Sequence, residues 1–235
     1  MASELNVGGI TTTGNVGIGK APANVDAYTR SLEVKGGTAA QGAAIYVGNE
    51  ADENSMRLSS WNGNGYIMVR GEKSLYIGAH TAHSALVISS AGAVTMPSTP
   101  AFSAMPSTNQ NNLAADTYTD IVLATEIFDQ GANFASNTFT APVAGRYQFS
   151  ALIAMNYIDS AANFYQIRIV TSNRTYSYTF DPDFGQDAIY WEGGPSILAD
   201  MDASDTAKVE FYQSGGTAQT DIVATRTVFT GFLAC

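Results

Sequence analysis

The stretch that decides the fold is FTAPVAGRYQFS, residues 139–150. An aromatic residue, Phe139, precedes a Pro-x-x-Gly turn signal formed by Pro142 and Gly145, and two aromatic residues, Tyr147 and Phe149, follow it two positions apart. Proline fixes φ and ends one extended run, whereas glycine permits a tight approach before the next run begins. Because side chains two positions apart in a strand share a face, the pattern predicts two strands with a common aromatic face.

Other strand-length runs surround this stretch in the second half of the chain. Alternating apolar positions recur in RYQFSALIA, NFYQIRIV, TYSYTF, AKVEFYQ and TVFTGFLA, and clusters of Gly, Asn, Asp and Ser separate them. The chain is rich in Gly (22), Tyr (12) and Phe (11) but has only 11 Lys and Arg, which disfavours helix. We therefore expect an all-β protein whose residues 113–235 form an antiparallel jelly-roll sandwich, the head.

Residues 1–96 follow a different pattern. Short runs such as 32–34, 45–47, 56–58, 67–69, 75–77, 86–88 and 94–96 carry apolar residues two positions apart. Such strands are too short to bury a face alone, so they need successive repeats or copies from other chains. The sequence thus predicts a β-rich repetitive shaft, or attachment region, over 1–96. A Pro-rich connection follows over 97–112, and it includes the first strand of the head.

Four segments of the second half resemble a known family. PAFSA (100–104), FTAPVAGRYQFS (139–150), ILADMDASDTAKVEFY (197–212) and TVFTGFLA (227–234) are similar in order and spacing to the globular head shared by complement component 1q and tumour necrosis factor. The resemblance begins near residue 100 and implies a jelly roll that forms homotrimers. The residues that carry it are Phe102, Phe139, Pro142, Gly145, Tyr147, Phe149, Phe229, Gly231 and Phe232.

The first half resembles a second class of protein. GNVGIG (14–19), SLEVKGG (31–37) and ALVISSAGAVTMPSTPAFSA (85–104) look like shaft segments of bacteriophage fibres, which commonly end in such a head. The resemblance implies a homotrimeric structural protein of the virion. It would contact other virion proteins through its N-terminal region and bind a host-surface glycan or protein. A carbohydrate-binding, lectin-like module of cellular origin is the alternative, and a polysaccharide-depolymerising tail spike is a third hypothesis.

The net charge and the lengths of the apolar runs limit the classes of partner and the location that we expect. The formal net charge of −10 argues against nucleic acid and against anionic membrane surfaces, both of which require clustered Lys and Arg. No apolar run reaches the length of a signal-peptide core or a membrane-spanning helix. We expect a protein that is assembled into virions in the host cytoplasm, without secretion by its own signal and without membrane insertion. The single cysteine, Cys235, allows no internal disulfide bond.

A ligand site is predicted in the stretch 181–192. Aromatic faces stack on sugar rings and carboxylates accept hydrogen bonds from hydroxyl groups. The predicted ligand-binding residues are Asp181, Asp183, Asp187, Tyr190, Trp191 and Glu192. The alternative is that the aromatic residues fill the core or the trimer interface while the acids are solvated. Glycoside hydrolysis needs two carboxyl groups across a cleft, and proximity in one loop is weak evidence for that geometry. We therefore expect no catalytic residues, no enzymatic activity and no cofactor.

The two histidines of the chain, His80 and His83, form the motif HTAH. In a strand these positions point to opposite faces, and no third metal ligand stands nearby in the sequence. Two turn histidines are the simpler interpretation. A metal site in which histidines of three chains meet on a common axis is the other.

Overall fold

The structure is a computed structural model that describes residues 43–49, 52–61, 64–69, 72–79 and 82–235. Within these ranges β-strands alternate with turns, one short 3₁₀ helix occurs, η1 (Ala224–Arg226), and there is no α-helix. The expectation of an all-β protein is confirmed. Among the described residues, no helix has the length and apolarity needed to cross a membrane.

The first sheet of the head contains seven strands in the order β15-β12-β19-β7-β9, and β16 and β18 also pair with β12. The long strand β12 holds this sheet together because it pairs with four others. The strands are β7 (Ala101–Met105), β9 (Thr125–Gln130), β12 (Gly145–Ile158), β15 (Ala188–Gly193), β16 (Ser196–Met201), β18 (Asp221–Ile222) and β19 (Val228–Leu233).

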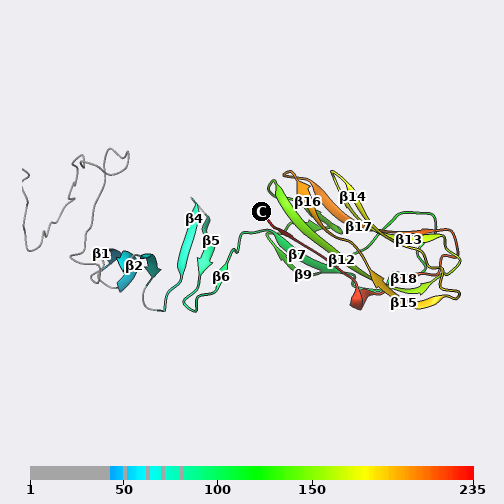
Figure 1. Cartoon of the computed structure of the whole chain (residues 1–235), viewed down its shortest axis with the longest axis horizontal. Helices are drawn as coiled ribbons and strands as arrows, with labels where there is room; N and C mark the ends of the chain where they lie inside the picture. Colours follow the sequence, from blue (N-terminus) through cyan, green and yellow to red (C-terminus); the bar gives the residue numbers. More distant parts are fainter. Residues whose placement is uncertain (1–42, 50–51, 62–63, 70–71, 80–81) are drawn as a thin grey trace, which may run out of the picture. The chain divides into compact units, whose positions relative to one another are not determined.

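The second sheet of the head contains six strands in the order β10-β11-β17-β13-β14, and β8 pairs with β17. The strands are β8 (Thr119–Asp120), β10 (Phe134–Ala135), β11 (Thr138–Thr140), β13 (Phe164–Thr171), β14 (Thr175–Phe180) and β17 (Thr206–Ser214). The chain repeatedly crosses between the sheets, from β11 to β12, from β12 to β13 and from β14 to β15, and all pairs are antiparallel (Figure 1). This connectivity is that of a jelly-roll sandwich, as the sequence predicts.

The aromatic core lies between the two sheets and is built from the residues of the opening motif. Phe139, Tyr147 and Phe149 are fully buried, and Phe102 of β7 stacks on Phe139 with ring centroids 5.0 Å apart. Phe229 of β19 meets Phe102 edge to face at the same separation, 5.0 Å. The first and last strands of the head therefore meet on one aromatic cluster, which the hydrophobic effect stabilises.

The turn between β11 and β12 is closed by its own tyrosine. The phenol of Tyr147 donates a hydrogen bond of 2.9 Å to the carbonyl oxygen of Val143, and burial raises the pKa of this phenol. Gly145 starts β12 where a Cβ atom would lie 2.6 Å from Leu233 Cδ1 and 2.8 Å from the carbonyl oxygen of Cys235. The glycine of the Pro-x-x-Gly motif thus allows the start of β12 to lie close against residues 233–235.

The described residues before the head form two small sheets. One has the order β1-β2-β3 and the other the order β4-β5-β6. The strands are β1 (Ala43–Asn49), β2 (Asp52–Trp61), β3 (Asn64–Val69), β4 (Leu75–Ala79), β5 (Ala82–Ile88) and β6 (Val94–Thr95). The predicted runs from 45 to 88 lie in these strands, β6 covers the first two residues of the run 94–96, and the run at 32–34 lies outside the described residues.

The chain divides into two compact units. Residues 76–88 and 93–235 belong to one unit, and the described residues up to Leu75, with 89–92, belong to the other. The predicted boundary between shaft and head at residues 96–97 stays a prediction.

Candidate functional site

A parallel stack of four aromatic rings runs from the core of the head to its surface. Tyr165 is fully buried and stacks on Phe180 at 5.2 Å with an interplanar angle of 9°. Phe180 stacks on Trp191 at 4.7 Å and 21°, and Trp191 stacks on Phe184 at 5.3 Å and 25°. The outermost ring, Phe184, is 41% exposed. We call these four residues the aromatic stack.

The alternation of two neighbouring strands builds the stack. In β14 the residues Tyr176, Tyr178 and Phe180 are half-buried, whereas the residues between them are exposed. In β15 Trp191 faces the core because it pairs with the fully buried Met155 of β12, whereas Tyr190 and Glu192 on either side are exposed. The two strands belong to different sheets, so Phe180 and Trp191 meet across the edge of the sandwich.

The indole nitrogen of Trp191 lacks a hydrogen-bond partner. Nε1 is buried, and no described protein atom accepts its proton. A buried N–H group without an acceptor costs about 1–3 kcal/mol relative to a satisfied one. Trp191 therefore contributes both an aromatic face and an unused donor at the edge of the sandwich.

Asp187 anchors the loop that carries Phe184. Its carboxylate accepts hydrogen bonds from the backbone N–H (3.0 Å) and hydroxyl (2.8 Å) of Ser160 and from Gln219 Nε2 (2.9 Å). The Gln219 amide, followed by the two Ser160 groups, holds the pKa of Asp187 below its ordinary value. Three loops are thereby joined at one end of the head, namely 159–163, 181–187 and 215–220. We call this end the acidic end, because these loops contain four Asp residues and no Lys or Arg.

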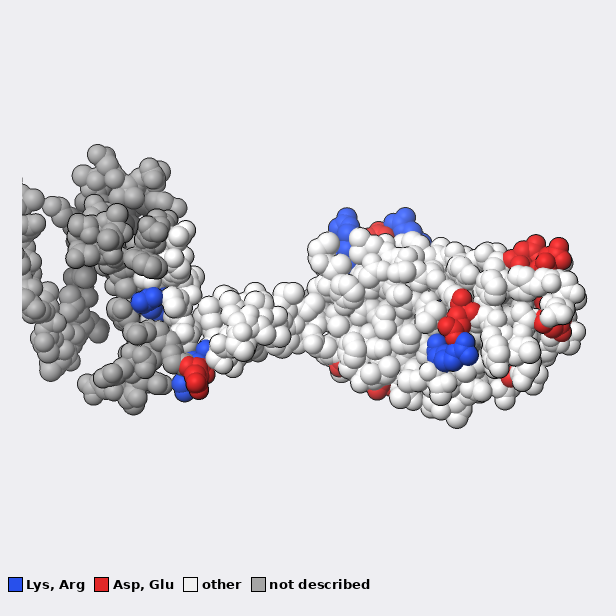
Figure 2. Space-filling view, turned by 60° about the horizontal axis from the view of Figure 1, so that its bottom comes forward, with Lys and Arg blue, Asp and Glu red and all other residues white. Residues whose placement is uncertain are grey.

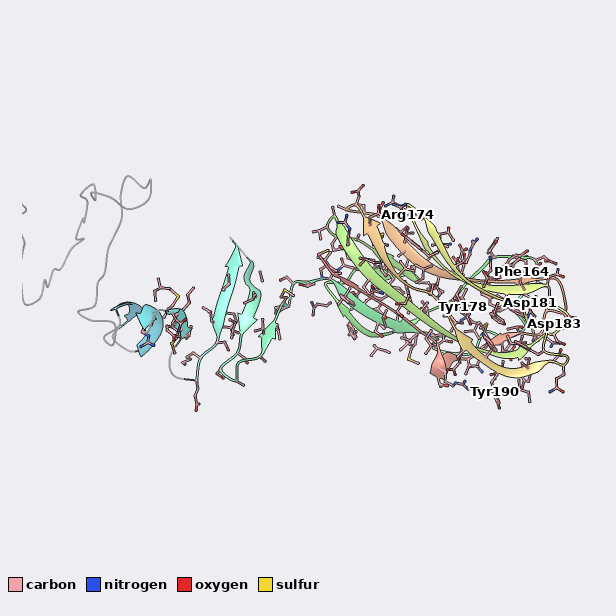
Figure 3. The ribbon with its side chains drawn as sticks, viewed as in Figure 1. Phe164, Arg174, Tyr178, Asp181, Asp183 and Tyr190 are labelled. Atoms are coloured by element: carbon pink, nitrogen blue, oxygen red, sulfur yellow. The ribbon has the colours of Figure 1, made fainter. Side chains whose placement is uncertain are left out.

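Asp181 and Asp183 lie at the acidic end with exposed side chains (Figure 3). Asp181 Oδ1 accepts the backbone N–H of Asp183 at 3.1 Å, and the backbone N–H of Phe184 donates to the carbonyl oxygen of Pro182. Both bonds are local to the loop. Figure 2 shows acidic side chains gathered at the right-hand end of the head with no basic side chain among them. The carboxylates of Asp181 and Asp183 therefore face solvent beside the exposed end of the aromatic stack.

Tyr190 and Glu192 lie on the outer face of the seven-stranded sheet, away from the stack. Tyr190 is 64% exposed, and the guanidinium carbon of Arg226 lies 5.7 Å from its ring centroid. Arg226 of η1 also forms an ion pair with Glu192. Glu192 is thus neutralised by a residue that follows it by 34 positions.

The geometry divides the six predicted ligand residues into three groups. Trp191 belongs to the aromatic stack, the three aspartates belong to the loop 181–187, and Tyr190 with Glu192 belongs to the outer sheet face. Of the six, only Trp191, Asp181 and Asp183 lie near one surface. Phe184 connects them, because it follows Asp183 in the loop and stacks on Trp191. The sequence pattern did not single out Phe180, Phe184 or Arg226. Phe180 could have been found from the alternation of TYSYTF, whereas nothing local signals Arg226.

The opposite end of the head carries a shallow depression of about 220 Å³. It is lined by residues 144–146, Asn173 and residues 200–202. Arg174 beside it donates three hydrogen bonds to Asp200, one from Nε and two from Nη2, which lower the pKa of that carboxyl group. Arg174 lies far from Asp181 and Asp183 in Figure 3. Arg174 and Asp200 already neutralise each other, so this pair offers little to a charged ligand.

His80 and His83 are the candidate metal ligands of the sequence. No group of three or more His, Cys, Asp or Glu within the described ranges is arranged to hold a metal ion. His80 lies outside the described residues, and for His83 the structure gives the backbone in β5 without a described side chain. The histidine site therefore stays a prediction.

Comparisons with known proteins find similarity only among solved structures. No protein-family model matches the chain, and no curated protein matches it either. Among solved structures, the globular domain of zebrafish complement 1qA is similar at 16% identity and a TM-score of 0.44, over 58% of this chain and 98% of that one. Two crystal structures of murine APRIL, at pH 8.0 and pH 8.5, are each 8% identical, with TM-scores of 0.43 and 0.42 over 57% of this chain and 98% of theirs. The jelly-roll assignment itself rests on the strand order.

Proposed function

We propose that the protein is a homotrimeric structural fibre or appendage of a virion. Its head joins three chains through the outer face of the seven-stranded sheet and binds a host-surface receptor. The observation that carries the proposal is an exposed apolar band on that face, whose large side chains are unusual for a monomer in water. The role is binding and assembly without turnover, in a particle assembled in host cytoplasm.

The apolar band is made of four side chains on neighbouring strands. Leu152 is 43% exposed, Leu198 53%, Phe232 49% and Phe128 51%. The pairing register places them on one face, because Gln148 of β12 is opposite both Leu198 and Phe232. Phe128 pairs with Ser103, whose other neighbour is Thr230 of β19. The residues between the four are neutral, so identical faces can approach without like-charge repulsion.

The small sheets before the head provide a second observation in favour of assembly. In β3 the adjacent residues Ile67 and Met68 are 61% and 40% exposed, and in β4 the adjacent residues Tyr76 and Ile77 are 60% and 50% exposed. Adjacent residues of a strand point to opposite faces. These strands therefore present apolar side chains on both faces of three-stranded sheets, which need a partner to be stable in water. Copies of the same segment in a trimer would supply one.

A trimer suits a fibre because several weak receptor sites on one particle bind with high avidity. The number three follows from the resemblance of the head sequence to complement component 1q and tumour necrosis factor. The N-terminal region would attach to other virion proteins, as the resemblance of residues 14–19, 31–37 and 85–104 to bacteriophage fibre shafts implies.

The test is the absolute mass of the full chain by light scattering, with an unboiled denaturing gel beside it. Three chains of 24.8 kDa predict a particle of about 74 kDa that withstands detergent until it is heated. A mass near 25 kDa at micromolar concentration would overturn the assembly, because both sets of exposed apolar side chains would then face water.

A further inference from the structure

We propose that the outer end of the aromatic stack is a binding slot for an uncharged sugar ring, now covered by Phe184 of the chain itself. A pyranose would replace the Phe184 ring on the face of Trp191 that does not contact Phe180. A hydroxyl group that extends past the rim of the sugar into the plane of the indole would accept the unused proton of Trp191 Nε1, because an indole N–H points along its own ring plane. The inference rests on the proposed receptor-binding role for its biological meaning, whereas its chemistry depends on one chain alone.

The stack provides a flat, rigid receiving surface. Trp191 is held from behind by Phe180 at 4.7 Å, and Phe180 is held by the fully buried Tyr165 at 5.2 Å. A preorganised ring gives up little conformational entropy when a ligand stacks on it. The apolar face of a pyranose fits such a surface in the same way as the Phe184 ring does, while its hydroxyl groups stay at the rim.

The unsatisfied indole nitrogen indicates that the stack lacks a polar partner. Phe184 satisfies the apolar face of Trp191 but offers no acceptor to Nε1, which is buried without one. A sugar ring offers both an apolar face and hydrogen-bond acceptors. Exchange of Phe184 for such a ring therefore conserves the stacking and removes the penalty of the buried donor.

The loop that carries Phe184 can move away from Trp191. Pro182 is buried and Asp187 is fixed by Ser160 and Gln219, so these two residues bound the segment 183–186. Within it, Gly185 adopts a φ of +74°, and a Cβ atom at this position would have no neighbour within 4 Å. Phe184 is the residue that ties this segment to the sandwich through its ring. Withdrawal of Phe184 breaks this one ring contact and leaves the backbone of the flanking strands in place.

The charge around the slot selects the ligand class. Exposed Asp181 and Asp183 flank the stack, and the three loops of the acidic end contain no Lys or Arg. A uronic acid, a sialic acid or a phosphate would meet like charges there without a counter-charge. An uncharged hexose or N-acetylhexosamine would instead donate its hydroxyl protons to the two carboxylates.

The test is saturation-transfer NMR on the full chain, with methyl glycosides of uncharged hexoses and N-acetylhexosamines as probes and methyl glucuronide as the acidic counterpart. We expect transfer to the uncharged glycosides only. Phe184→Ala should strengthen binding by about 3- to 10-fold because no ring competes for Trp191. Trp191→Phe keeps a ring but removes the donor, and should weaken binding by about fivefold.

The matched control is Tyr118→Ala, which removes an aromatic side chain of similar exposure (48%) that stacks on Tyr212 of the six-stranded sheet. It should leave binding unchanged. The proposal is overturned if the Phe184→Ala chain shows no transfer to any uncharged glycoside, if the glucuronide binds equally well, or if Tyr118→Ala weakens binding as much as Trp191→Phe. Light scattering on the same samples reports the trimer separately, so loss of assembly and loss of sugar binding are distinguished.

Discussion

Replacement of Phe232 by Asp should convert the protein into folded monomers. Phe232 is 49% exposed on the outer face of the seven-stranded sheet, and β19 pairs it with Gln148 and Ala101. Full burial of a Phe side chain is worth about 1.5–3 kcal/mol, so covering the exposed half stabilises each contact by about 1 kcal/mol. Loss of three such contacts removes about 3 kcal/mol from a trimer, or roughly a 100-fold change in its equilibrium constant.

The new carboxylate adds a second penalty. Each Asp would be desolvated in the contact between chains, which adds to the cost of assembly. The assay is sedimentation velocity from nanomolar to micromolar concentration, with near-ultraviolet circular dichroism to verify that the aromatic core is intact. Ser177→Asp is the control, because Ser177 is exposed on β14 of the other sheet. A Phe232→Asp chain that remains a trimer at nanomolar concentration would refute the assignment of this face as the interface.

Two further predictions concern the stability of the head. Gly231→Ala should lower the free energy of unfolding by about 1–3 kcal/mol through overpacking. A Cβ atom there would lie 2.5 Å from a ring carbon of Phe149 and 2.7 Å from one of Phe102. The measurement is urea denaturation, and an unchanged midpoint would contradict this packing. Asp187→Asn should weaken the acid dependence of stability. The pKa of Asp187 is lowered by Gln219 and Ser160, so its contribution is complete above the ordinary pKa of about 4 and is lost as the pH falls below that value. Melting temperatures of the two proteins should therefore differ most near pH 6–7 and converge toward pH 3, and a constant difference would disprove the role of this carboxylate.

The core of the head could be predicted because its signal is local. Tyr147, Phe149, Ala151 and Ile153 alternate with less buried residues in the sequence, and all four are buried in β12. Period-two alternation reports which face of a strand is covered, whatever covers it. The same rule explains Phe232, which resembles a fold residue in sequence but faces outward, because it is one position beyond the inward Gly231.

The candidate site could be predicted only in part because its contacts are tertiary. Alternation in β15 already implies that Trp191 points away from its neighbours Tyr190 and Glu192, so these three could not form one surface. By contrast, the ion pair of Glu192 with Arg226 joins residues 34 positions apart. Only the pairing of β12 with β15 on one side and β19 on the other brings them together.

The distribution of charge reconciles self-association with a strongly acidic head. Residues 97–235 contain fourteen Asp and Glu and five Lys and Arg, a net charge of −9, so three heads together carry −27. Such a charge would oppose assembly if it lay on the contact surface. The centre of the seven-stranded face instead carries Leu152, Phe232 and neutral polar residues. The exposed acids Asp181 and Asp183 lie at the far end of the head, where they face solvent in the proposed trimer (Figure 3). Over separations beyond the Debye length of about 10 Å their mutual repulsion is largely screened at 0.1 M salt. The same segregation leaves the slot on Trp191 beside the carboxylates of Asp181 and Asp183, which is the reason that an uncharged sugar fits it better than an acidic one.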